Sequence, residues 1–395
     1  MLPRPPRTVQ VLALWAACTA TSLLILRLGA ADTGATPWAG PSPSWGEHLR
    51  FWDAGWYERI ARQGYPAVLP VDGAGVVQQN AWAFMPLLPL LTGLLTWSGA
   101  GFYPLAAVVC LAASAGAAVV LDRWLAPRAG GAASLWAVAL VWSSPCAAVL
   151  QVPYGESLGL LLVCAGLWLA GRRRFLAALP LVALAALARP VGVPLTGALG
   201  LWWLMEEAQA RGTVPRAALA RLLPGHEVLE ARQRRGLLVL VLGAATATAA
   251  WPVAAWLVTG RVDAYTATET AWRQGAAPDV LPWLARSATW VGPHLGWLLV
   301  LGVLAAGALV LSAPGVRSLG AVPWCWCVSY CLYLLVFFDP TSSVFRLLLP
   351  LAPTAWAVGR AGTRVRALLL VAGVVGQLFW VSWVWDRTVQ MTWIP

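Results

Sequence analysis

Charged side chains are scarce in this sequence of 395 residues, and lysine is absent altogether. Charged residues make up only 11% of the chain and hydrophobic residues 59%, whereas soluble globular domains carry about 25% charged residues. This shortage of charge excludes an ordinary soluble protein. Apolar runs of about 20 residues recur from end to end, and each is long enough to cross a bilayer as a helix. The sequence therefore predicts a polytopic integral membrane protein.

Cysteine is missing from the long polar loops, because all seven cysteines lie within apolar runs. No disulfide framework is therefore implied. Cys325, Cys327 and Cys331 are close together, but no histidine or carboxylate lies near them in the sequence. This favours small apolar core residues over a metal site. A glycine-rich nucleotide-binding loop is also missing, which disfavours a cytoplasmic enzyme acting on nucleotide sugars.

The basic residues are all arginine, and they gather between the apolar runs. A net charge of +11 is compatible with nucleic acid, but no basic patch with interleaved aromatic residues supports such a partner. The clusters instead have the distribution that the positive-inside rule gives to cytoplasmic loops. They are Arg4 and Arg7, Arg172 to Arg174, Arg211 to Arg235, and Arg360 to Arg366.

Counting spans between these clusters predicts an all-α bundle of about 11 transmembrane helices, with a cytoplasmic N-terminus and an extracytoplasmic C-terminus. The predicted spans are 8–30, 103–121, 131–150, 155–170, two short helices within 175–204 divided at Arg189-Pro190, 236–258, 294–312, 320–338, 345–360 and 367–385. By this count the segment 82–98 enters and leaves on the external side. We therefore expect it to be an interfacial or re-entrant helix.

The whole chain is thus expected to form a single membrane domain over residues 1–395. It carries three predicted loops of interest: an extracytoplasmic loop with interfacial helices at 31–101, a basic cytoplasmic loop at 205–235, and a second extracytoplasmic loop at 260–293. The first loop is long and rich in proline, glycine and tryptophan. Loops of this length are usually functional or disordered.

One segment of the first loop has the pattern of an amphipathic helix. At about 100° per residue, its apolar side chains share one face: Trp52, Trp56, Tyr57 and Ile60. Its charged side chains share the other face: Glu58, Arg59 and Arg62. Gly64 and Pro66 then end the helix. Such a helix is suited to lie on the outer membrane surface.

Asp53 breaks this pattern, because it projects between Tyr57 and Ile60 on the apolar face. Removal of a carboxylate from water raises its pKa toward that of a useful general base, which is a recurrent property of active sites. A different role is open to the same residue, since an aspartate at the start of a helix often caps its backbone N–H groups. The residues alone leave both interpretations open.

This loop resembles the signature of the PIG-V family, the membrane mannosyltransferases that add the second mannose in eukaryotic GPI-anchor assembly, together with their bacterial relatives. The matching run is Trp52-Asp53-Ala54-x-x-Tyr57-x-x-Ile60-Ala61-x-x-Gly64-Tyr65, followed by Ala83-Phe84-Met85-Pro86-Leu87-x-Pro89. Three shorter matches follow in order: Pro153-Tyr154-Gly155-Glu156-Ser157, Ala188-Arg189-Pro190-Val191-Gly192 and Arg346-Leu347-Leu348-Leu349-Pro350. The family's usual second phenylalanine is Met85 here.

The resemblance implies a GT-C fold, a helical membrane bundle whose external loop binds a polyprenyl-phosphate sugar. It implies that Asp53 is the general base. It also implies a set of substrate-binding residues: Trp52, Trp56, Tyr57, Tyr65, Phe84, Tyr154 and Glu156. No cofactor is expected beyond the lipid-linked donor. Position 55 is glycine, so a two-carboxylate D-x-D arrangement is missing and no metal site is predicted.

Arginine is the expected ligand of the departing lipid phosphate, because its forked N–H groups match phosphate oxygens. We predict this role for Arg346, which follows the Asp339-Pro340 turn at the external start of a span, and for Arg189. A snorkelling interfacial arginine is the alternative for Arg346. Arg189 and Glu156 both lie near the external ends of short apolar helices, where they are either functional or paired with each other as structural residues.

The leading hypothesis is a mannosyltransferase of the bacterial inner membrane. It would transfer the sugar from polyprenyl-phosphate mannose to a glycolipid, a lipoglycan or an exported protein on the outer face, in contact with membrane lipid and without nucleic acid. A lipid or sugar transporter or flippase is the second hypothesis, but it predicts ionisable residues near mid-membrane and paired broken helices. The third is a non-catalytic subunit of a glycosyltransferase complex, against which Asp53 and Arg346 argue.

Overall fold

The structure is a computed structural model that describes residues 5–272, 282–338 and 340–386. Helices account for 76% of it. Within the described residues, the one element of β-pairing is an isolated bridge between Val71 and Val77. The prediction of an all-α fold is confirmed.

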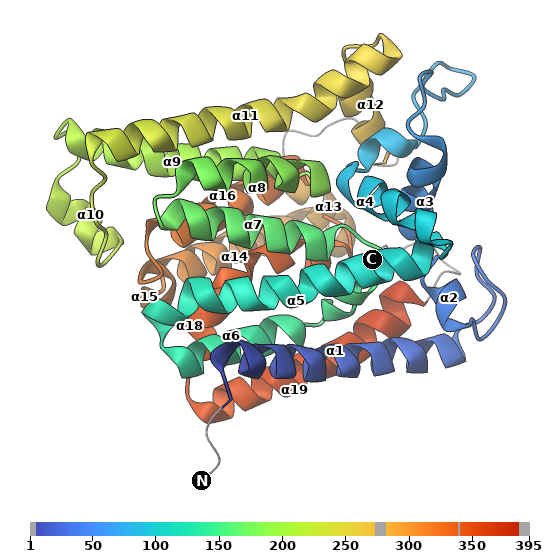
Figure 1. Ribbon diagram of the computed structural model, residues 1–395, viewed down its shortest axis with the longest axis horizontal. Coiled ribbons are helices and arrows are strands. Elements are labelled where there is room, and N and C mark those ends of the chain that lie inside the picture. The colour runs from blue at the N-terminus through green and yellow to red at the C-terminus, as the bar shows by residue number, and fades with distance from the viewer. Residues whose placement is uncertain (1–4, 273–281, 339, 387–395) are drawn as a thin grey trace.

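Long apolar helices lie side by side and form the body of the molecule (Figure 1). Among the described residues, five helical segments are long and apolar enough to cross a membrane. They are α1 (Arg7–Asp32), α5 (Phe102–Ala129), α11 (Ala231–Thr259), α14 (Pro293–Ser312) and α19 (Thr363–Trp380), the last continuing as the π-helical turn η5 (Val381–Trp385). These segments support a multi-pass membrane protein.

Further apolar helices lie among these segments. They are α6 (Gly131–Trp142), α7 (Glu156–Gly171), α8 (Phe175–Ala188), α9 (Gly192–Ala210) and α16 (Ala321–Phe337). The chain breaks between α8 and α9 at Arg189-Pro190, as the sequence predicts. Because length and composition qualify five segments, the count of 11 spans stays a prediction.

Two of the predicted spans do not form continuous helices, so the prediction is wrong for them. The segment 131–150 is helical only to Trp142 and resumes as the 3₁₀ helix η3 (Ala147–Gln151) after Pro145. The segment 345–360 is divided into α17 (Val344–Leu347), the 3₁₀ helix η4 (Leu349–Thr354) and α18 (Ala355–Gly359). Proline explains both breaks, since it lacks the backbone N–H that an α-helix requires and clashes with the preceding turn.

Short helices gather at one end of the bundle (Figure 1). They are α2 (Trp45–His48), α3 (Ala54–Gln63), η1 (Ala81–Ala83), α4 (Leu87–Leu95), η2 (Thr96–Ser98), α12 (Ala264–Ala271) and α13 (Pro282–Val291). At 1.5 Å per residue, α4 is only about 14 Å long, whereas the hydrocarbon core of a bilayer measures about 30 Å. It is therefore too short to cross. We call this the loop end of the molecule. Part of the predicted loop 260–293 lies outside the described residues.

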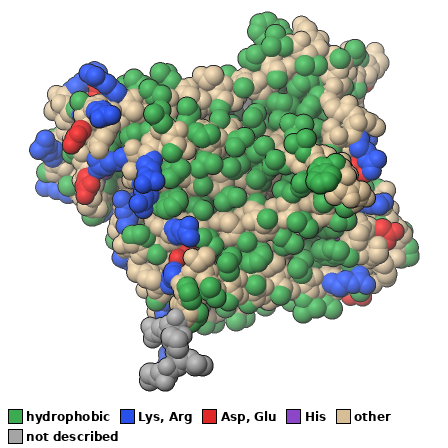
Figure 2. All heavy atoms as spheres, viewed as in Figure 1, with side chains coloured by type: hydrophobic (Ala, Val, Ile, Leu, Met, Phe, Trp, Pro, Cys, Tyr) green, Lys and Arg blue, Asp and Glu red, His purple; other side chains and the backbone are tan. Residues whose placement is uncertain are grey.

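The opposite end carries most of the arginines. Figure 2 shows hydrophobic side chains across the middle of the molecule, while arginines gather at the end where α9 turns through α10 (Arg216–Leu222) into α11. These helices leave residues 211–230 for the predicted basic loop. The short helix α15 (Pro314–Arg317) connects α14 to α16. The charge asymmetry between the two ends is the one that the positive-inside rule describes.

Buried polar contacts fix α1 against its neighbours. At the arginine-rich end, the guanidinium Nε of Arg7 donates to the carboxylate Oδ2 of Asp122 across 3.0 Å. Near the loop end, the hydroxyl of Ser22 donates to the Oε1 atom of Gln377 on α19 across 2.8 Å. Hydrogen bonds inside an apolar bundle specify which helix faces meet, because an unmatched polar group there is costly. Helices α1 and α19 therefore reach the loop end in a defined register.

Candidate functional site

A sharp turn before α3 orients Asp53. Trp52 has a backbone φ of +56°, in the left-handed region that bulky side chains rarely occupy. Two hydrogen bonds hold this turn: the indole Nε1 of Trp52 donates to the carbonyl oxygen of Trp385 across 2.8 Å, and the backbone N–H of Asp53 donates to the hydroxyl of Tyr154 across 3.0 Å. Strain of this kind persists only where the surroundings enforce it. Helix α3 begins at Ala54, so the prediction that Trp52 lies on the helix face is wrong.

Asp53 occupies the N-cap position of α3, but its side chain makes no capping hydrogen bond. The capping interpretation is therefore wrong. Its carboxylate Oδ2 instead accepts from the Nη2 atom of Arg346 across 3.1 Å, and only 20% of the side chain is exposed. Burial raises the pKa of the Asp53 carboxyl above its ordinary value of 3.8; the Arg346 charge opposes this rise, and the negative charge of Glu156 adds to it.

Glu156 and Arg189 extend this ion pair into a cluster. The Nη1 atoms of Arg346 and Arg189 both donate to the Oε1 atom of Glu156, across 2.8 Å and 2.7 Å. Two carboxylates and two guanidinium groups therefore alternate, and their formal charges sum to zero. Glu156 is 3% exposed and both arginines are nearly buried. We call Asp53, Arg346, Glu156 and Arg189 the charge cluster. Arg346 is thus no snorkelling surface residue.

The sequence around Arg189 explains how it reaches Glu156. Arg189 has an extended backbone, the conformation that a following proline imposes. A Cβ atom at Gly155 would lie 2.8 Å from the carbonyl oxygen of Ala188, and one at Gly159 would lie 2.7 Å from the Cγ atom of Arg189. The two glycines at the start of α7 therefore leave the space through which the Arg189 side chain passes.

Arg346 is fixed by the broken segment that carries it. Its guanidinium lies 5.3 Å from the centre of the Tyr154 ring, within the range of a cation–π contact. The proline-rich break frees backbone carbonyls, and buried donors bind them. The Tyr330 hydroxyl donates to the carbonyl of Leu347, and the Trp326 indole donates to that of Pro350. Asp339, the first residue of the predicted turn, lies outside the described residues.

The charge cluster borders a cavity of about 10 Å³, which is lined by Glu156, Arg189, Arg346 and apolar side chains. A space of this size holds about one water molecule. Within the described part of the chain, two buried polar atoms at the cluster have no hydrogen-bond partner: Glu156 Oε2 and Arg346 Nε. The cluster therefore retains hydrogen-bonding capacity, and this cavity has no room for a sugar in this conformation.

Aromatic side chains at the loop end pack against one another. The rings of Trp56 and Phe84 stack with centroids 5.6 Å apart, Tyr57 meets Phe84 edge-on at 5.5 Å, and Trp272 packs against both Trp56 and Phe84. Tyr57 also lies 6.5 Å from Tyr154 between ring centres. The predicted substrate-binding residues Trp56, Tyr57, Phe84 and Tyr154 are therefore adjacent to one another.

Tyr65 has a supporting position instead of a place at the cluster. Its hydroxyl donates to the carbonyl of Phe84 across 2.9 Å. Its ring packs against both Trp82 and Trp251, with centroids 4.7 Å from each. Tyr65 thus holds the backbone of Phe84 in position.

Several residues at this end were not identified from the sequence. The carbonyl oxygen of Trp385 accepts a hydrogen bond from the Trp52 indole. Trp272 packs against Trp56 and Phe84. The Nε2 atom of His48 lies 2.8 Å from the Oδ1 atom of Asp386, and both side chains are buried. The sequence offers one signal for Trp385, which is that Trp380, Trp383 and Trp385 lie close together at the end of the last predicted span. Partners this distant in sequence leave no local pattern.

No metal-binding group of three or more histidine, cysteine or acidic residues occurs in the described ranges. The predicted absence of a metal site stays a prediction. Cys325 and Cys327 are free and buried, in keeping with apolar core residues.

No protein-family model and no curated protein matches the sequence. Among solved structures, ArnT from Cupriavidus metallidurans bound to undecaprenyl phosphate is similar over 90% of this chain and 62% of its own, with a TM-score of 0.50 and 13% identity. The Archaeoglobus fulgidus oligosaccharyltransferase tethered with an acceptor peptide is similar over 98% of this chain and 56% of its own, with a TM-score of 0.48 and 12% identity. This chain thus spans less than two thirds of either protein. The likeness to ArnT shows a GT-C-type fold, as predicted.

Proposed function

We propose that this chain is a membrane glycosyltransferase that moves a sugar from a polyprenyl-phosphate carrier to an acceptor. In its specific form the proposal names mannose as the sugar, the outer face of the bacterial inner membrane as the location, and a glycolipid, lipoglycan or exported protein as the acceptor. One observation carries it: a mostly buried carboxylate, Asp53, is held beside two phosphate-compatible guanidinium groups at the loop end. The PIG-V resemblance of the first loop supports mannose.

The fold supports a lipid-linked donor. The ArnT structure that this chain resembles holds undecaprenyl phosphate, which is a polyprenyl phosphate. A donor of that class needs a site near the membrane boundary, with cationic groups for its phosphate. Arg346 and Arg189 meet this requirement, because both are cationic and both lie at the loop end of the apolar bundle, in the short helix α17 and at the end of α8. The arginine-rich opposite end supports a cytoplasmic N-terminus, which would place the charge cluster on the outer face.

The proposed reaction is a single inverting displacement. The acceptor hydroxyl attacks the anomeric carbon of the donor sugar while the Asp53 carboxylate removes the hydroxyl proton. The bond between the anomeric carbon and the phosphate oxygen breaks, and its electron pair leaves with the lipid phosphate. Burial makes Asp53 a stronger base than an ordinary aspartate, since it raises the pKa of this carboxyl.

Under this proposal, donor binding rearranges the charge cluster. The cavity beside it holds only about one water molecule, and Arg346 is occupied by Asp53 and Glu156. We infer that the donor phosphate replaces Asp53 as a partner of Arg346. Asp53 then loses the cation that lowers its pKa, so the base becomes stronger when the donor arrives. Donor binding and activation of the base are thereby coupled.

The deciding experiment is a transfer assay with purified protein, radiolabelled polyprenyl-phosphate mannose and a membrane extract as the source of acceptor. We expect Asp53→Asn to lose about 10²–10⁴-fold in rate, the usual contribution of a general base. Asp263→Asn is the matched control, because Asp263 is an exposed acid at the same end and pairs with Arg261. The melting temperature of each variant reports whether it folds.

Equal transfer by the wild type and Asp53→Asn would remove Asp53 from the mechanism. An absence of transfer by the wild type with any polyprenyl-phosphate sugar would reject the enzyme in favour of a non-catalytic subunit. Parallel donors that carry glucose or arabinose test the specificity for mannose. Competition by unlabelled polyprenyl phosphate, weakened in Arg346→Ala, tests the phosphate role.

A further inference from the structure

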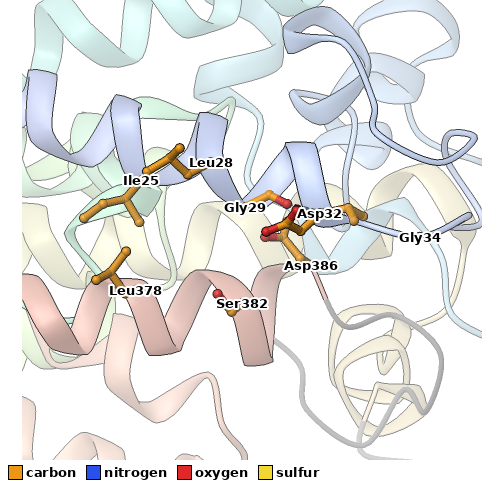
Figure 3. A pocket seen from close by; sticks show the side chains of 9 residues that line it. Ile25, Leu28, Gly29, Asp32, Gly34, Leu378, Ser382 and Asp386 are labelled. Atoms are coloured by element: carbon orange, nitrogen blue, oxygen red, sulfur yellow. Dashed lines mark hydrogen bonds between the residues drawn. The ribbon is translucent and has the colours of Figure 1, made fainter.

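A second pocket lies between α1 and α19 at the loop end, with a volume of about 380 Å³. It is separate from the charge cluster. Figure 3 shows that it is polar toward the end of the helices, where Asp32, Ser382 and Asp386 lie, and apolar further along, where Ile25 and Leu378 face each other. The pocket thus combines an acidic mouth with an aliphatic interior.

Asp386 is the buried acid of this pocket. Its side chain is only 7% exposed, and its Oδ1 atom accepts from His48. Its Oδ2 atom has no hydrogen-bond partner among the described residues. That oxygen lies against Gly29, where any side chain would collide with it. The glycine therefore makes room for a carboxylate oxygen that remains unmatched inside the pocket wall.

Asp32 adds a second negative charge to the lining of this pocket. Figure 3 shows Asp32 and Asp386 at the Gly29 end of the pocket, and both acids line it. Neither acid pairs with an arginine within the described part of the chain. Two carboxylates that line one partly apolar pocket repel each other, and a cation bound between them reduces that repulsion.

The aliphatic wall identifies the kind of cation. Leu28 and Leu378 line the pocket and are also exposed on the apolar surface of the bundle, so the pocket opens toward lipid chains. A metal ion gains no free energy from contact with aliphatic side chains, whereas the apolar chain of an amphiphile buries its surface against them. A primary ammonium group has three N–H donors. Three side chains that carry acceptor oxygens line the mouth: Asp32, Asp386 and Ser382.

We propose that this pocket binds a primary ammonium group carried on an apolar chain, as in the head group of an aminolipid. The ammonium lies between Asp32 and Asp386, and the chain follows Leu28 and Leu378 into the bilayer. This site does not depend on the proposed transferase activity, and none of its lining residues belongs to the charge cluster.

The test uses purified full-length chain in a neutral detergent, titrated with dodecylamine or with 1-dodecanol, and binding is measured by calorimetry. We expect saturable binding of dodecylamine and none of dodecanol. Asp32→Asn should weaken dodecylamine binding about tenfold, which corresponds to one lost charge contact, while Asp263→Asn leaves it unchanged. Asp32 is exposed, so its substitution should leave the fold intact. Ser382→Leu, which narrows the mouth, should also weaken binding.

Lipid nanodiscs distinguish the source of the amine. Native mass spectrometry should show phosphatidylethanolamine retained by the wild type and lost in Asp32→Asn, with phosphatidylcholine retained by neither. Retention of dodecylamine alone would assign the site to small amphiphilic amines of the same class. Equal binding of dodecanol and dodecylamine, or equal affinity of Asp32→Asn and wild type, would overturn the proposal. Displacement of dodecylamine by Mg²⁺ that chelation reverses would overturn it in favour of a metal site.

Discussion

Arg346 donates a hydrogen bond to Asp53 across 3.1 Å, although 293 positions separate the two residues in the sequence. The sequence singled them out for different reasons, Asp53 as an acid on an apolar face and Arg346 as a cation after a turn. Their contact means that in this conformation the proposed base and the proposed phosphate ligand neutralise each other. The pKa of Asp53 therefore becomes the measurable quantity that reports on the cluster.

The acid limb of the pH–rate profile should move in opposite directions in two variants. In the wild type we expect its midpoint above 3.8, the ordinary pKa of an aspartate, because burial raises the pKa of Asp53. Arg346→Gln removes a cation that lowers this pKa, so the midpoint should rise. Glu156→Gln removes an anion that raises it, so the midpoint should fall. Residual single-turnover transfer measured against pH checks both, and shifts of the same sign would contradict the arrangement of charges.

Asp53 should also make the free energy of unfolding depend on pH. A carboxyl whose folded pKa is raised holds its proton more tightly in the native than in the unfolded chain. The free energy of unfolding should therefore fall as the pH rises from about 3.8 through the folded pKa, and level off above it. Asp53→Asn should flatten this part of the curve. Denaturation of both proteins over this pH range checks the sign, and parallel curves would show that Asp53 is not perturbed.

The space that Gly159 leaves for the Arg189 side chain predicts that one added methyl group at position 159 lowers stability and transfer. Gly159→Ala would place a Cβ atom 2.7 Å from the Arg189 side chain, so we expect a loss of about 1–3 kcal/mol in stability from overpacking and reduced transfer. Gly55→Ala is the matched control, because nothing lies within 4 Å of its Cβ position in α3. That change should stabilise the helix by about 0.5–1 kcal/mol. Melting curves and transfer rates measure both; equal behaviour would mean that Arg189 adapts freely.

The turn at Trp52 predicts a positioning role. Trp52→Phe keeps a large ring but removes the indole N–H that donates to Trp385. The cost to stability should be about 1 kcal/mol, while the transfer rate should fall more than donor affinity does, because the orientation of Asp53 is loosened. Trp97→Phe is the control, since Trp97 is exposed in η2. A Trp52→Phe enzyme with wild-type turnover would show that the strained turn does not orient the base.

The apolar runs predicted the long helices well, because a helix that crosses a bilayer needs a continuous stretch of apolar residues. The exceptions were the segments around Pro145 and around Pro350 and Pro353, where hydropathy concealed the helix-breaking effect of proline. The break at Arg189-Pro190 was recognised because arginine clusters required two crossings there. Hydropathy therefore locates apolar segments better than it locates continuous helices.

The sequence indicated the four residues of the charge cluster but not the contacts that they make with one another. Asp53, Glu156, Arg189 and Arg346 were all named from the sequence, but their order in the charge cluster depends on four separate segments meeting at one end of the bundle. The pairing of Glu156 with Arg189 was foreseen as an alternative to function, whereas the structure joins both to Arg346 and Asp53. The left-handed backbone of Trp52 was unforeseeable, since it is imposed by Trp385 and Tyr154.

The zero net charge of the cluster has a consequence for turnover under the proposed reaction. A donor phosphodiester carries one negative charge, and the released lipid monophosphate carries up to two. Two guanidinium groups already matched by two carboxylates are poorly suited to retain the more highly charged product. Once Asp53 gives up its captured proton, its restored charge repels the spent carrier and competes for Arg346. The salt bridge between Arg346 and Asp53, which closes the site before the donor binds, would thus also favour release of the lipid phosphate product. Its re-formation would return the site to its starting arrangement.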